Sequence, residues 1–344
     1  MPLNNLFFLY NVRHTYPNPD DQLVQLDTDF DDPAAIEWMV KHLKNLSFKN
    51  VVAIEADEKA YLELYKRKDD IDLVFNFAEG LHGNDRECHF PAMLEMLRLP
   101  YTGCSPLSSA LILNKAAAKN ILFCAGLPVL PQQVFRTGDE ELKGDLKFPM
   151  IVKPVAQGSS AGISNKSVVN DAGELKERVE FIIKHFSQDA LVEPFLTGRE
   201  FSVPMLGNPP EILPIIESDH STLPAGYNPL DSLEVKWIIE EKTGGANFIC
   251  PAKLDADLEK KIKNICFETW KALDVLDFCR VDIRCDKNNN PFVLEVNSPA
   301  GLIPPEVSMT SYFPLSARKA GLDYETLLCK IISAACSRYG IEYN

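Results

Sequence analysis

Hydrophobic and polar positions in the first third of the chain follow two alternating periods. Runs typical of buried strands stand at Leu6–Tyr10, Val51–Ile54 and Asp72–Phe77. Between them, hydrophobic residues recur at helical spacing, first after Asp31 or Asp32 and again over Glu58–Lys66. Strands that alternate with helices indicate a mostly parallel sheet. The pattern therefore predicts an open α/β domain over residues 1–103.

The acidic stretch that ends at Asp31 and Asp32 has two interpretations. A helix cap is favoured, because Pro33 follows at the first helical turn and acids stabilise the positive end of a helix. A metal site is the alternative, since the Asp-x-Asp-x-Asp-Asp spacing offers several carboxylates.

After Ser105 the pattern changes. The sequence predicts helices over Leu107–Ala125, Leu254–Leu273 and Tyr324–Tyr339. Residues 217–250 lack clear periodicity, and a connection of that length is often a lid over a site. We divide this part of the chain into a central subdomain, residues 104–190, and a C-terminal subdomain, residues 191–344.

Two segments near the C-terminal end predict a hairpin. Arg280–Arg284 and Pro291–Asn297 are rich in β-favouring residues, and turn residues lie between them. Side chains alternate between faces along a strand, so Asp282, Glu295 and Asn297 face one point if the strands pair in register. Such oxygen ligands suit Mg²⁺ that also holds substrate phosphates. The alternative is a hairpin whose outer face carries salt bridges.

Other residues suit a polyphosphate. A predicted strand delivers Lys153 to a loop, Gly158–Gly162, whose backbone N–H groups can face an anion, although the pattern is not that of a P-loop. Arg280, beside the predicted metal ligands, can bind a phosphoryl group or a developing oxyanion. The extended segment Ala190–Leu196 can pass an adenine, and the carboxylate of Glu200 can accept ribose hydroxyls.

Composition narrows the class of protein. The 344 residues are 46% hydrophobic and 24% charged, which is typical of a soluble globular protein of two or three domains. A net charge of −14 argues against a nucleic-acid partner. No apolar run is long enough to span a bilayer, and the N-terminus has no basic leader. Nine cysteines without a C-x-x-C pair fit reduced thiols, so we expect a cytoplasmic protein.

Short motifs run in order from about residue 72 to the end of the chain. They are Asp72–Asn76, Leu99–Gly103, Leu113–Lys115, Ile151–Pro154, Gly158–Gly162, Glu193–Phe201, Cys250–Ala252, Arg280–Asp282, Leu294–Asn297, Phe313–Ala317 and Ala320-Gly321. This ordered set resembles the ATP-grasp superfamily, and within it the D-alanine–D-alanine ligase family. The fold that the resemblance implies is α/β (α+β ATP-grasp), with the N-terminal α/β domain followed by two α+β subdomains that grip ATP between them.

The resemblance also implies roles for residues at matching positions, with ATP and two Mg²⁺ ions, or Mn²⁺, as cofactors. The nucleotide would be bound by Lys115, Lys153, Gly158, Ser159, Ser160, Glu193, Pro194, Phe195, Leu196 and Glu200. The metal ions would be bound by Asp282, Glu295 and Asn297. The catalytic residues would be Arg280, Ser159, Lys236 and Gly301. Within this set, Lys115 and Lys153 would hold the phosphates and Lys236 would meet the γ-phosphate from the lid.

The amino-acid pockets depart from the family pattern. The family's N-terminal Gly-Gly-x-Ser-x-Glu loop has no counterpart, and an insertion, Ile303–Thr310, precedes Ser311, which resembles the serine that binds the acceptor carboxylate. Trp237 stands in place of the lid tyrosine. After the third strand, Glu79 is expected to take a cationic group of the substrate, and Arg86 to hold a carboxylate or to stabilise the loop. An ion pair between these two residues is the alternative.

Together these features predict an ATP-dependent carboxylate–amine ligase that forms an amide or peptide bond through an acyl phosphate, on amino-acid or small-peptide substrates. Phosphoryl transfer needs positioning and charge neutralisation, so no protein nucleophile is expected. One alternative is a true D-alanine–D-alanine ligase of cell-wall synthesis, and the other is an inactive ATP-binding sensor or partner subunit. The expected partners are small carboxylates and amines, with no nucleic acid and no membrane, and with a homodimer as the quaternary structure.

Overall fold

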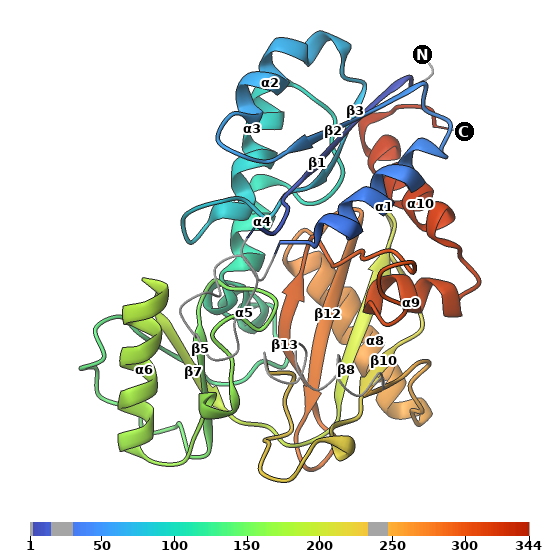
Figure 1. Cartoon of the computed structure of the whole chain (residues 1–344). Coiled ribbons are helices and arrows are strands. Elements are labelled where there is room, and N and C mark those ends of the chain that lie inside the picture. Colours follow the sequence, from blue (N-terminus) through green and yellow to red (C-terminus); the bar gives the residue numbers. More distant parts are fainter. Residues whose placement is uncertain (1–2, 15–29, 233–246, 344) are drawn as a thin grey trace.

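The computed structural model describes residues 3–14, 30–232 and 247–343 of the chain. The N-terminal part holds a parallel sheet of order β2-β1-β3 (Figure 1). Its strands are β1 (Asn5–Tyr10), β2 (Asn50–Glu55) and β3 (Leu73–Phe77). Its helices are α1 (Pro33–Lys44), α2 (Ala60–Arg67) and α3 (His89–Leu97). The predicted alternation of strands and helices is therefore confirmed.

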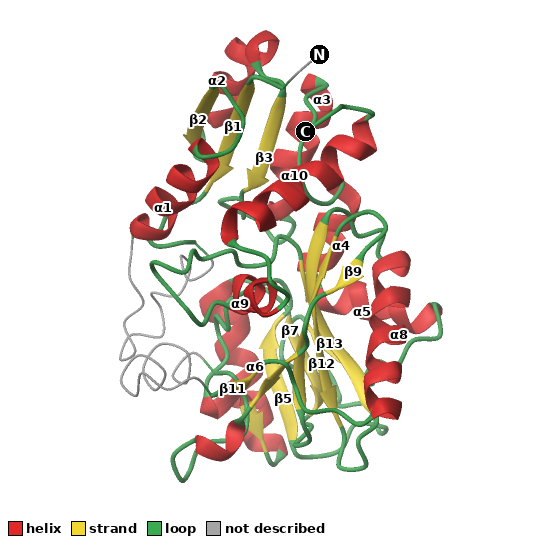
Figure 2. Cartoon of the chain, turned by 90° about the vertical axis from the view of Figure 1, so that its right-hand side faces the viewer, coloured by secondary structure: helices red, strands yellow, loops and turns green. Residues whose placement is uncertain are grey.

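Alternating side chains of β1 supply two hydrophobic cores. Leu6 and Phe8 pack in a cluster with residues of α1 and of α10 (Tyr324–Tyr339). Phe7 and Leu9 pack on the other face with residues of α2 and α3. The closing helix α10 lies beside the N-terminal sheet in both views, so the end of the chain covers a face of the domain at its start (Figures 1 and 2).

The predicted helix Leu107–Ala125 is two helices, α4 (Pro106–Leu113) and α5 (Lys115–Cys124). Asn114 interrupts it with an extended backbone, and its side chain caps α5 by accepting a hydrogen bond of 3.0 Å from the Ala117 N–H. Asparagine is a strong N-cap, and this local competition ends the first helix. The break places Lys115 on the first turn of α5.

The helix cap favoured for the acidic stretch is present. Asp32 caps α1, since its Oδ1 accepts from the Ala34 N–H at 2.9 Å. Helix α3 is preceded by a 3₁₀ turn, Arg86–Cys88.

The central part of the chain forms a four-stranded antiparallel sheet of order β4-β7-β5-β6, covered by α6 (Ala172–Phe186). Its strands are β4 (Gln133–Phe135), β5 (Met150–Pro154), β6 (Val168–Val169) and β7 (Ala190–Pro194). The strand predicted to deliver Lys153 is β5, and Lys153 stands one residue from its end.

The second antiparallel sheet has six strands, of order β11-β10-β8-β12-β13 with β9 paired to β8. Its strands are β8 (Glu200–Leu206), β9 (Glu211–Ile212), β10 (Ile216–Ser218), β11 (Phe248–Ile249), β12 (Phe278–Cys285) and β13 (Pro291–Asn297). Helix α8 (Ala256–Ala272), capped by Asp255, packs with Val281 and Ile283 of β12. The alternate residues of β12, beginning at Arg280, therefore face the opposite side. Helix α9 (Tyr312–Lys319) lies near β8 (Figure 1).

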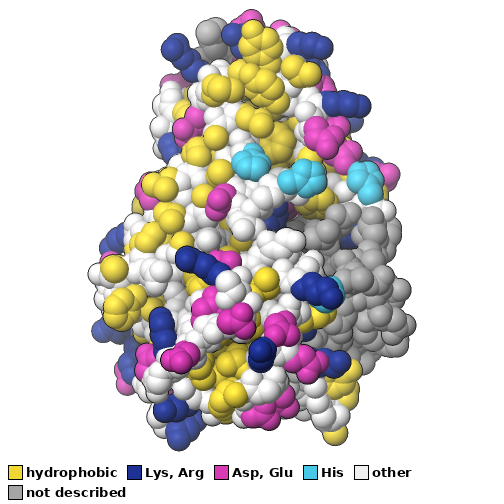
Figure 3. Space-filling model, turned by 90° about the vertical axis from the view of Figure 1, so that its left-hand side faces the viewer, with side chains coloured by type: hydrophobic (Ala, Val, Ile, Leu, Met, Phe, Trp, Pro, Cys, Tyr) yellow, Lys and Arg dark blue, Asp and Glu magenta, His cyan; other side chains and the backbone are white. Residues whose placement is uncertain are grey.

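The cysteines, the described helices and one face of the surface can be compared with what the composition predicted. All nine cysteines are free. None of the described helices is both long and apolar enough to cross a membrane. On the face drawn in Figure 3, acidic and basic side chains are interspersed over the lower part and hydrophobic side chains gather over the upper part.

Candidate active site

A cavity of about 630 Å³ lies where the three parts of the chain meet. Its size is within the range of small-molecule sites. Strands β5, β7, β12 and β13 contribute to its wall, together with loops of the N-terminal domain and the segment before α9. Most of the predicted site residues lie in this wall. From the nucleotide set these are Lys153, Ser159, Ser160, Glu193, Pro194, Phe195, Leu196 and Glu200, and from the metal set Asp282 and Glu295. Arg280 and Gly301, predicted as catalytic, and Ser311, predicted for the substrate, also lie there.

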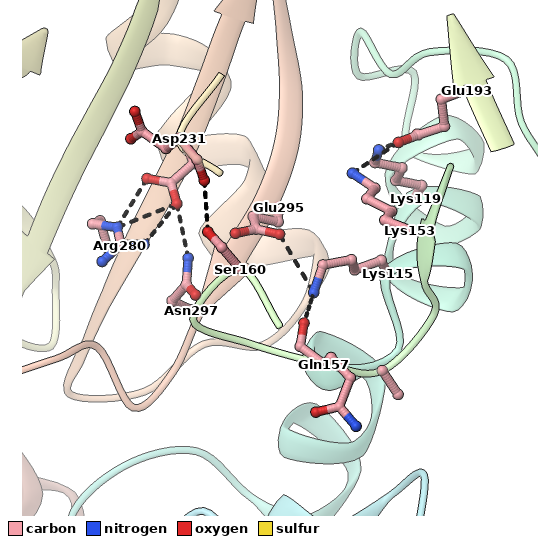
Figure 4. A network of polar contacts seen from close by, with 12 residues as sticks. Lys115, Lys119, Lys153, Gln157, Ser160, Glu193, Asp231, Arg280, Glu295 and Asn297 are labelled. Carbon is pink, nitrogen blue, oxygen red and sulfur yellow. Dashed lines mark hydrogen bonds and ion pairs between the residues drawn. The ribbon is translucent and has the colours of Figure 1, made fainter. Parts of the chain in front are cut away.

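The hairpin of β12 and β13 pairs in the predicted register. Arg280 lies opposite Asn297, and Asp282 lies opposite Glu295. The Asn297 amide donates to Asp282 Oδ2 at 2.9 Å, and the Arg280 guanidinium donates to both oxygens of Asp282 at 2.8–3.2 Å (Figure 4). Burial by itself would lower the pKa of Arg280, but the Asp282 carboxylate outweighs burial and raises it. Arg280 is thus a permanent cation in the cavity wall.

The second carboxylate of the hairpin faces Lys115. Lys115 Nζ lies 3.4 Å from Glu295 Oε2 and donates to the Gln157 carbonyl at 2.5 Å (Figure 4). The side chain of Lys115 is buried, and its backbone N–H is bonded to the Val155 carbonyl at 3.0 Å, so the residue is held next to the segment that leads into the Gly158–Gly162 loop. The break between α4 and α5 therefore fixes a lysine between the loop and the predicted metal ligands.

The donor set of the hairpin fits Mg²⁺. Two carboxylates and one amide oxygen are hard ligands, and Mg²⁺ sites commonly use one or two carboxylates and complete the shell with water and phosphate. Among the described residues, no group of three His, Cys, Asp or Glu side chains is arranged to hold a metal ion. An ion here would therefore need Asn297, water and substrate oxygens in addition to Asp282 and Glu295.

A single buried carboxylate lies between two lysines at the junction of α5, β5 and β7. Glu193 Oε2 lies 2.9 Å from Lys153 Nζ, and Glu193 Oε1 accepts a hydrogen bond from Lys119 Nζ (Figure 4). Burial would raise the pKa of Glu193, but the two lysines outweigh it and lower it. Lys119 was missed by sequence reasoning; the available signal was its position on α5, one helical turn after Lys115.

The loop between β5 and β6 has an unusual backbone at two predicted residues. Ser159 has φ +46° and Ser160 has φ +61°, a left-handed region that non-glycine residues seldom adopt. Ser160 Oγ donates to the Asp231 carbonyl at 2.7 Å, which fastens the loop across the cavity to the segment after β10 (Figure 4). Both serines line the cavity together with Lys153.

The hinge after β7 carries the residues predicted for adenine and ribose. Pro194, Phe195 and Leu196 line the cavity, and the Phe195 N–H is bonded to the Pro149 carbonyl at 3.0 Å. Glu200 Oε2 accepts from Arg284 at 2.5 Å and lies 3.0 Å from His220 Nε2. Sequence reasoning gave neither partner a role. Both hold the carboxylate in place at this end of the cavity.

The other end of the cavity is built from loops, and it contains residues that sequence reasoning did not place in a substrate site. Asp31 and Asp32 line it, in addition to the cap that Asp32 supplies to α1. Arg13 also lines it; its N–H donates to the Asp31 carbonyl at 2.8 Å and its guanidinium to Phe30 at 2.6 Å. Burial raises the pKa of Asp31 to about 7, against the lowering effect of Arg13. The position of Arg13 just beyond β1 was the available signal, because ligands bind at the carboxyl ends of parallel strands.

The insertion before α9 also faces this end. Ile303, Val307, Ser308 and Thr310 line the cavity with Ser311. The insertion is thus part of the wall where the sequence departs most from the family.

Glu79 and Arg86 lie outside the described lining of the cavity. Arg86 is buried and donates to the Ala156 carbonyl at 2.9 Å, so it joins the N-terminal domain to the start of the phosphate loop. The backbone N–H of Glu79 is bonded to Asn11 Oδ1 at 2.9 Å. Lys236 and Trp237 lie outside the residues that the structure describes.

Comparisons with known proteins show which family this chain belongs to. Residues 121–333 match the family described as D-ala D-ala ligase C-terminus. The chain is 32% identical to a D-alanine–D-alanine ligase of Pelotomaculum thermopropionicum, over 86% of this chain and 90% of that one. The chain belongs to the D-alanine–D-alanine ligase family. It is also 37% identical to an uncharacterized protein, y4sG, of Sinorhizobium fredii, over 78% of this chain and 75% of the relative.

Solved structures agree with this family and with the α/β ATP-grasp fold. A crystal structure of the D-alanine–D-alanine ligase of Bacillus anthracis superposes with a TM-score of 0.71 at 26% identity, covering 98% of this chain and 99% of that one. The same ligase complexed with ATP gives a TM-score of 0.70 at 23% identity, which shows the shared fold. The predicted enzyme class is thereby confirmed: this is an ATP-grasp ligase of the carboxylate–amine type.

Proposed function

We propose that the chain binds ATP in this cavity and joins a small carboxylate to an amine through an acyl phosphate. The observation that carries the proposal is that three cations, from β5, β12 and α5, lie in or beside one cavity that also holds the carboxylates of the β12–β13 hairpin. Lys153 and Arg280 line it directly, and Lys115 reaches Glu295 from α5. Such an arrangement supplies the positioning and the charge neutralisation that phosphoryl transfer needs.

In the proposed reaction, a substrate carboxylate oxygen attacks the γ-phosphorus of ATP and ADP leaves. Lys115, Lys153 and the N–H groups of the loop at Ser159 and Ser160 hold the phosphates in line. The amine nitrogen then attacks the acyl carbon, and Arg280 stabilises the oxyanion that forms. Phosphate leaves, and the nitrogen gives up its proton. Mg²⁺ ions bound by Asp282, Glu295 and Asn297 would supply further neutralisation of phosphate charge.

For the substrate, we propose an amino acid or a small peptide. The loop-built end of the cavity carries both charge signs, with Arg13 beside Asp31 and Asp32. A zwitterion with an ammonium and a carboxylate group is complementary to such a wall. D-alanine remains a candidate, because named relatives are D-alanine–D-alanine ligases. Leu9–Thr15, however, does not match the family's N-terminal Gly-Gly-x-Ser-x-Glu loop.

Mass spectrometry of the products tests this function. The protein is incubated with ATP, Mg²⁺ and a mixed pool of amino acids, polyamines and small peptides, and ADP release is followed in parallel. We expect a new condensation product that requires both a carboxylate and an amine. Tight ATP binding without turnover on any pool would instead support the inactive sensor. Omission of Mg²⁺ tests the metal, and sedimentation velocity tests the homodimer expected from the family.

A further inference from the structure

The protein interior holds two lysines for one carboxylate. The side chains of Lys119, Lys153 and Glu193 are only 2%, 7% and 1% exposed. Charged groups are rarely buried unless they are paired, because burial removes their hydration. Lys115 and Glu295 form a separate ion pair, and Glu295 and Glu200 act on these lysines through their charge alone. The trio therefore has one positive charge in excess, and an interior with an excess cation is suited to an incoming anion.

The two lysines differ in their contacts with the carboxylate. Lys119 donates a hydrogen bond to Glu193 Oε1. Lys153 lies farther from the carboxylate, at 2.9 Å from Oε2. The contact of Lys153 is therefore the longer and weaker of the two ion pairs.

The two lysines also differ in their access to the cavity. Lys153 and Glu193 line it, whereas Lys119, on α5, is not part of the described lining. Figure 4 shows the two lysines reaching the carboxylate from different elements. An anion in the cavity can thus draw Lys153 away from Glu193 without touching Lys119.

We propose that Lys119 is a positioning residue for ATP: it keeps Glu193 paired while Lys153 moves from Glu193 to the phosphates. Without Lys119, that move would leave a buried carboxylate without a counter-ion, and such a charge is strongly unfavourable. With Lys119 in place, one carboxylate keeps one cation before and after the exchange. This inference rests on the proposed ATP binding and adds a residue that does not itself touch the nucleotide.

Because Lys119 and Lys153 lose their protons at different pH values, the pH dependence of ATP binding can test the proposal in the wild-type protein. Burial lowers the pKa of Lys119 to about 8. The positive charge of Lys153 lowers this pKa further, whereas the carboxylates of Glu193 and, more weakly, Glu295 oppose the shift. Glu193 outweighs the effect of burial on Lys153 and raises its pKa. As pH rises above about 8, Lys119 therefore loses its proton first. Lys153 then remains the only cation on Glu193, and ATP affinity should fall.

The test measures the Kd of a nonhydrolysable ATP analogue by calorimetry. We expect Lys119→Met to raise this Kd about tenfold or more, and to raise the KM for ATP more than it lowers kcat. In a Glu193→Gln background the same substitution should change Kd less than threefold, because no buried charge then needs a partner. Lys263, a half-buried lysine of α8 paired with Glu259, provides a control, Lys263→Met, which should leave Kd unchanged.

Two results would overturn the proposal. One is an equal rise in Kd for Lys119→Met with and without Glu193→Gln, since that would mark a general structural effect. The other is a wild-type Kd that is constant between pH 7.5 and 9, and this measurement needs no variant to fold. Lys119→Arg, which keeps the charge, should remove the pH dependence. Failure of the wild-type protein to bind the analogue at any pH would refute the proposed function itself.

Discussion

The two ends of the cavity are built differently. At the nucleotide end, the charged side chains stand on or next to strands and α5, and they are buried and paired, as in the Lys119–Glu193–Lys153 trio. At the substrate end, the wall consists of loops, namely Arg13 after β1, the residues before α1, and the insertion Ile303–Thr310.

This difference gives a physical reason why we propose to transfer the family's residue roles to one end and not to the other. Triphosphate charge is the same for every ATP-dependent ligase, so its partners can be fixed on rigid elements. Loops tolerate insertion and substitution without disturbing the core, so the choice of substrate changes there. The comparison predicts large effects for nucleotide-end substitutions and small, substrate-specific effects at the other end.

The largest effect is expected for Glu295→Gln, which removes a charge from the proposed metal site with little change in side-chain volume. Turnover, measured as ADP release with saturating substrates, should be abolished. The melting temperature should stay close to that of the wild type, because Glu295 is only partly buried. Glu268→Gln, an exposed position on α8, is the control and should be fully active. An active Glu295→Gln enzyme would remove the metal assignment.

A smaller effect is expected for Lys153→Ala. Loss of a charge-assisted hydrogen bond to phosphate should weaken ATP binding by roughly 1.5–3 kcal/mol. Calorimetric titration with a nonhydrolysable analogue measures it, and Lys147→Ala, an exposed lysine just before β5, serves as the control. An unchanged Kd would mean that Lys153 stays on Glu193 when nucleotide binds.

The sequence predicted the hairpin because two strands joined by a tight turn leave little freedom in register, whereas its metal ligands stay a prediction. It also predicted β5 with Lys153 and the closing helix at its observed bounds. It could not predict the break at Asn114, where a local cap overrides helical periodicity, nor Lys119, whose role depends on α5 meeting β7. Asp31 looked like a cap residue because neighbouring Asp32 is one, and only the fold brings it to the cavity.

A pH-dependent effect of intermediate size is expected at the substrate end, where His42 holds the insertion. Its Nε2 lies 3.1 Å from Glu306, in the insertion, and its Nδ1 lies 2.7 Å from Glu325 of α10. Both nitrogens can donate only when the ring is protonated. Burial would lower the pKa of His42, but the two carboxylates outweigh it and raise the pKa above 6.5.

A raised pKa in the folded state means that this stabilisation is complete below the unfolded value and is lost as pH rises through the folded value. His42→Gln should therefore lower the free energy of unfolding by about 1 kcal/mol at pH 5.5 and by almost nothing at pH 9. Urea denaturation at the two pH values measures the difference. His14→Gln, at a histidine 69% exposed, is the control, and an equal loss at both pH values for His42→Gln would contradict the expected coupling.

The smallest effect is expected for Glu79→Gln, and this variant decides between two hypotheses. The backbone N–H groups of Glu79 and Gly80 donate to Asn11 Oδ1. Glu79 is not among the described residues that line the cavity. We therefore expect KM for the amino substrate, KM for ATP and the melting temperature to stay within about twofold or two degrees of wild type, since substitutions away from a site are usually nearly neutral. Ser311→Ala, which does lie in the wall, should raise the amino-substrate KM more. If Glu79→Gln instead raises that KM tenfold with ATP kinetics unchanged, the sequence-based hypothesis that Glu79 binds a cationic group is correct, and the loop after β3 belongs to the substrate end.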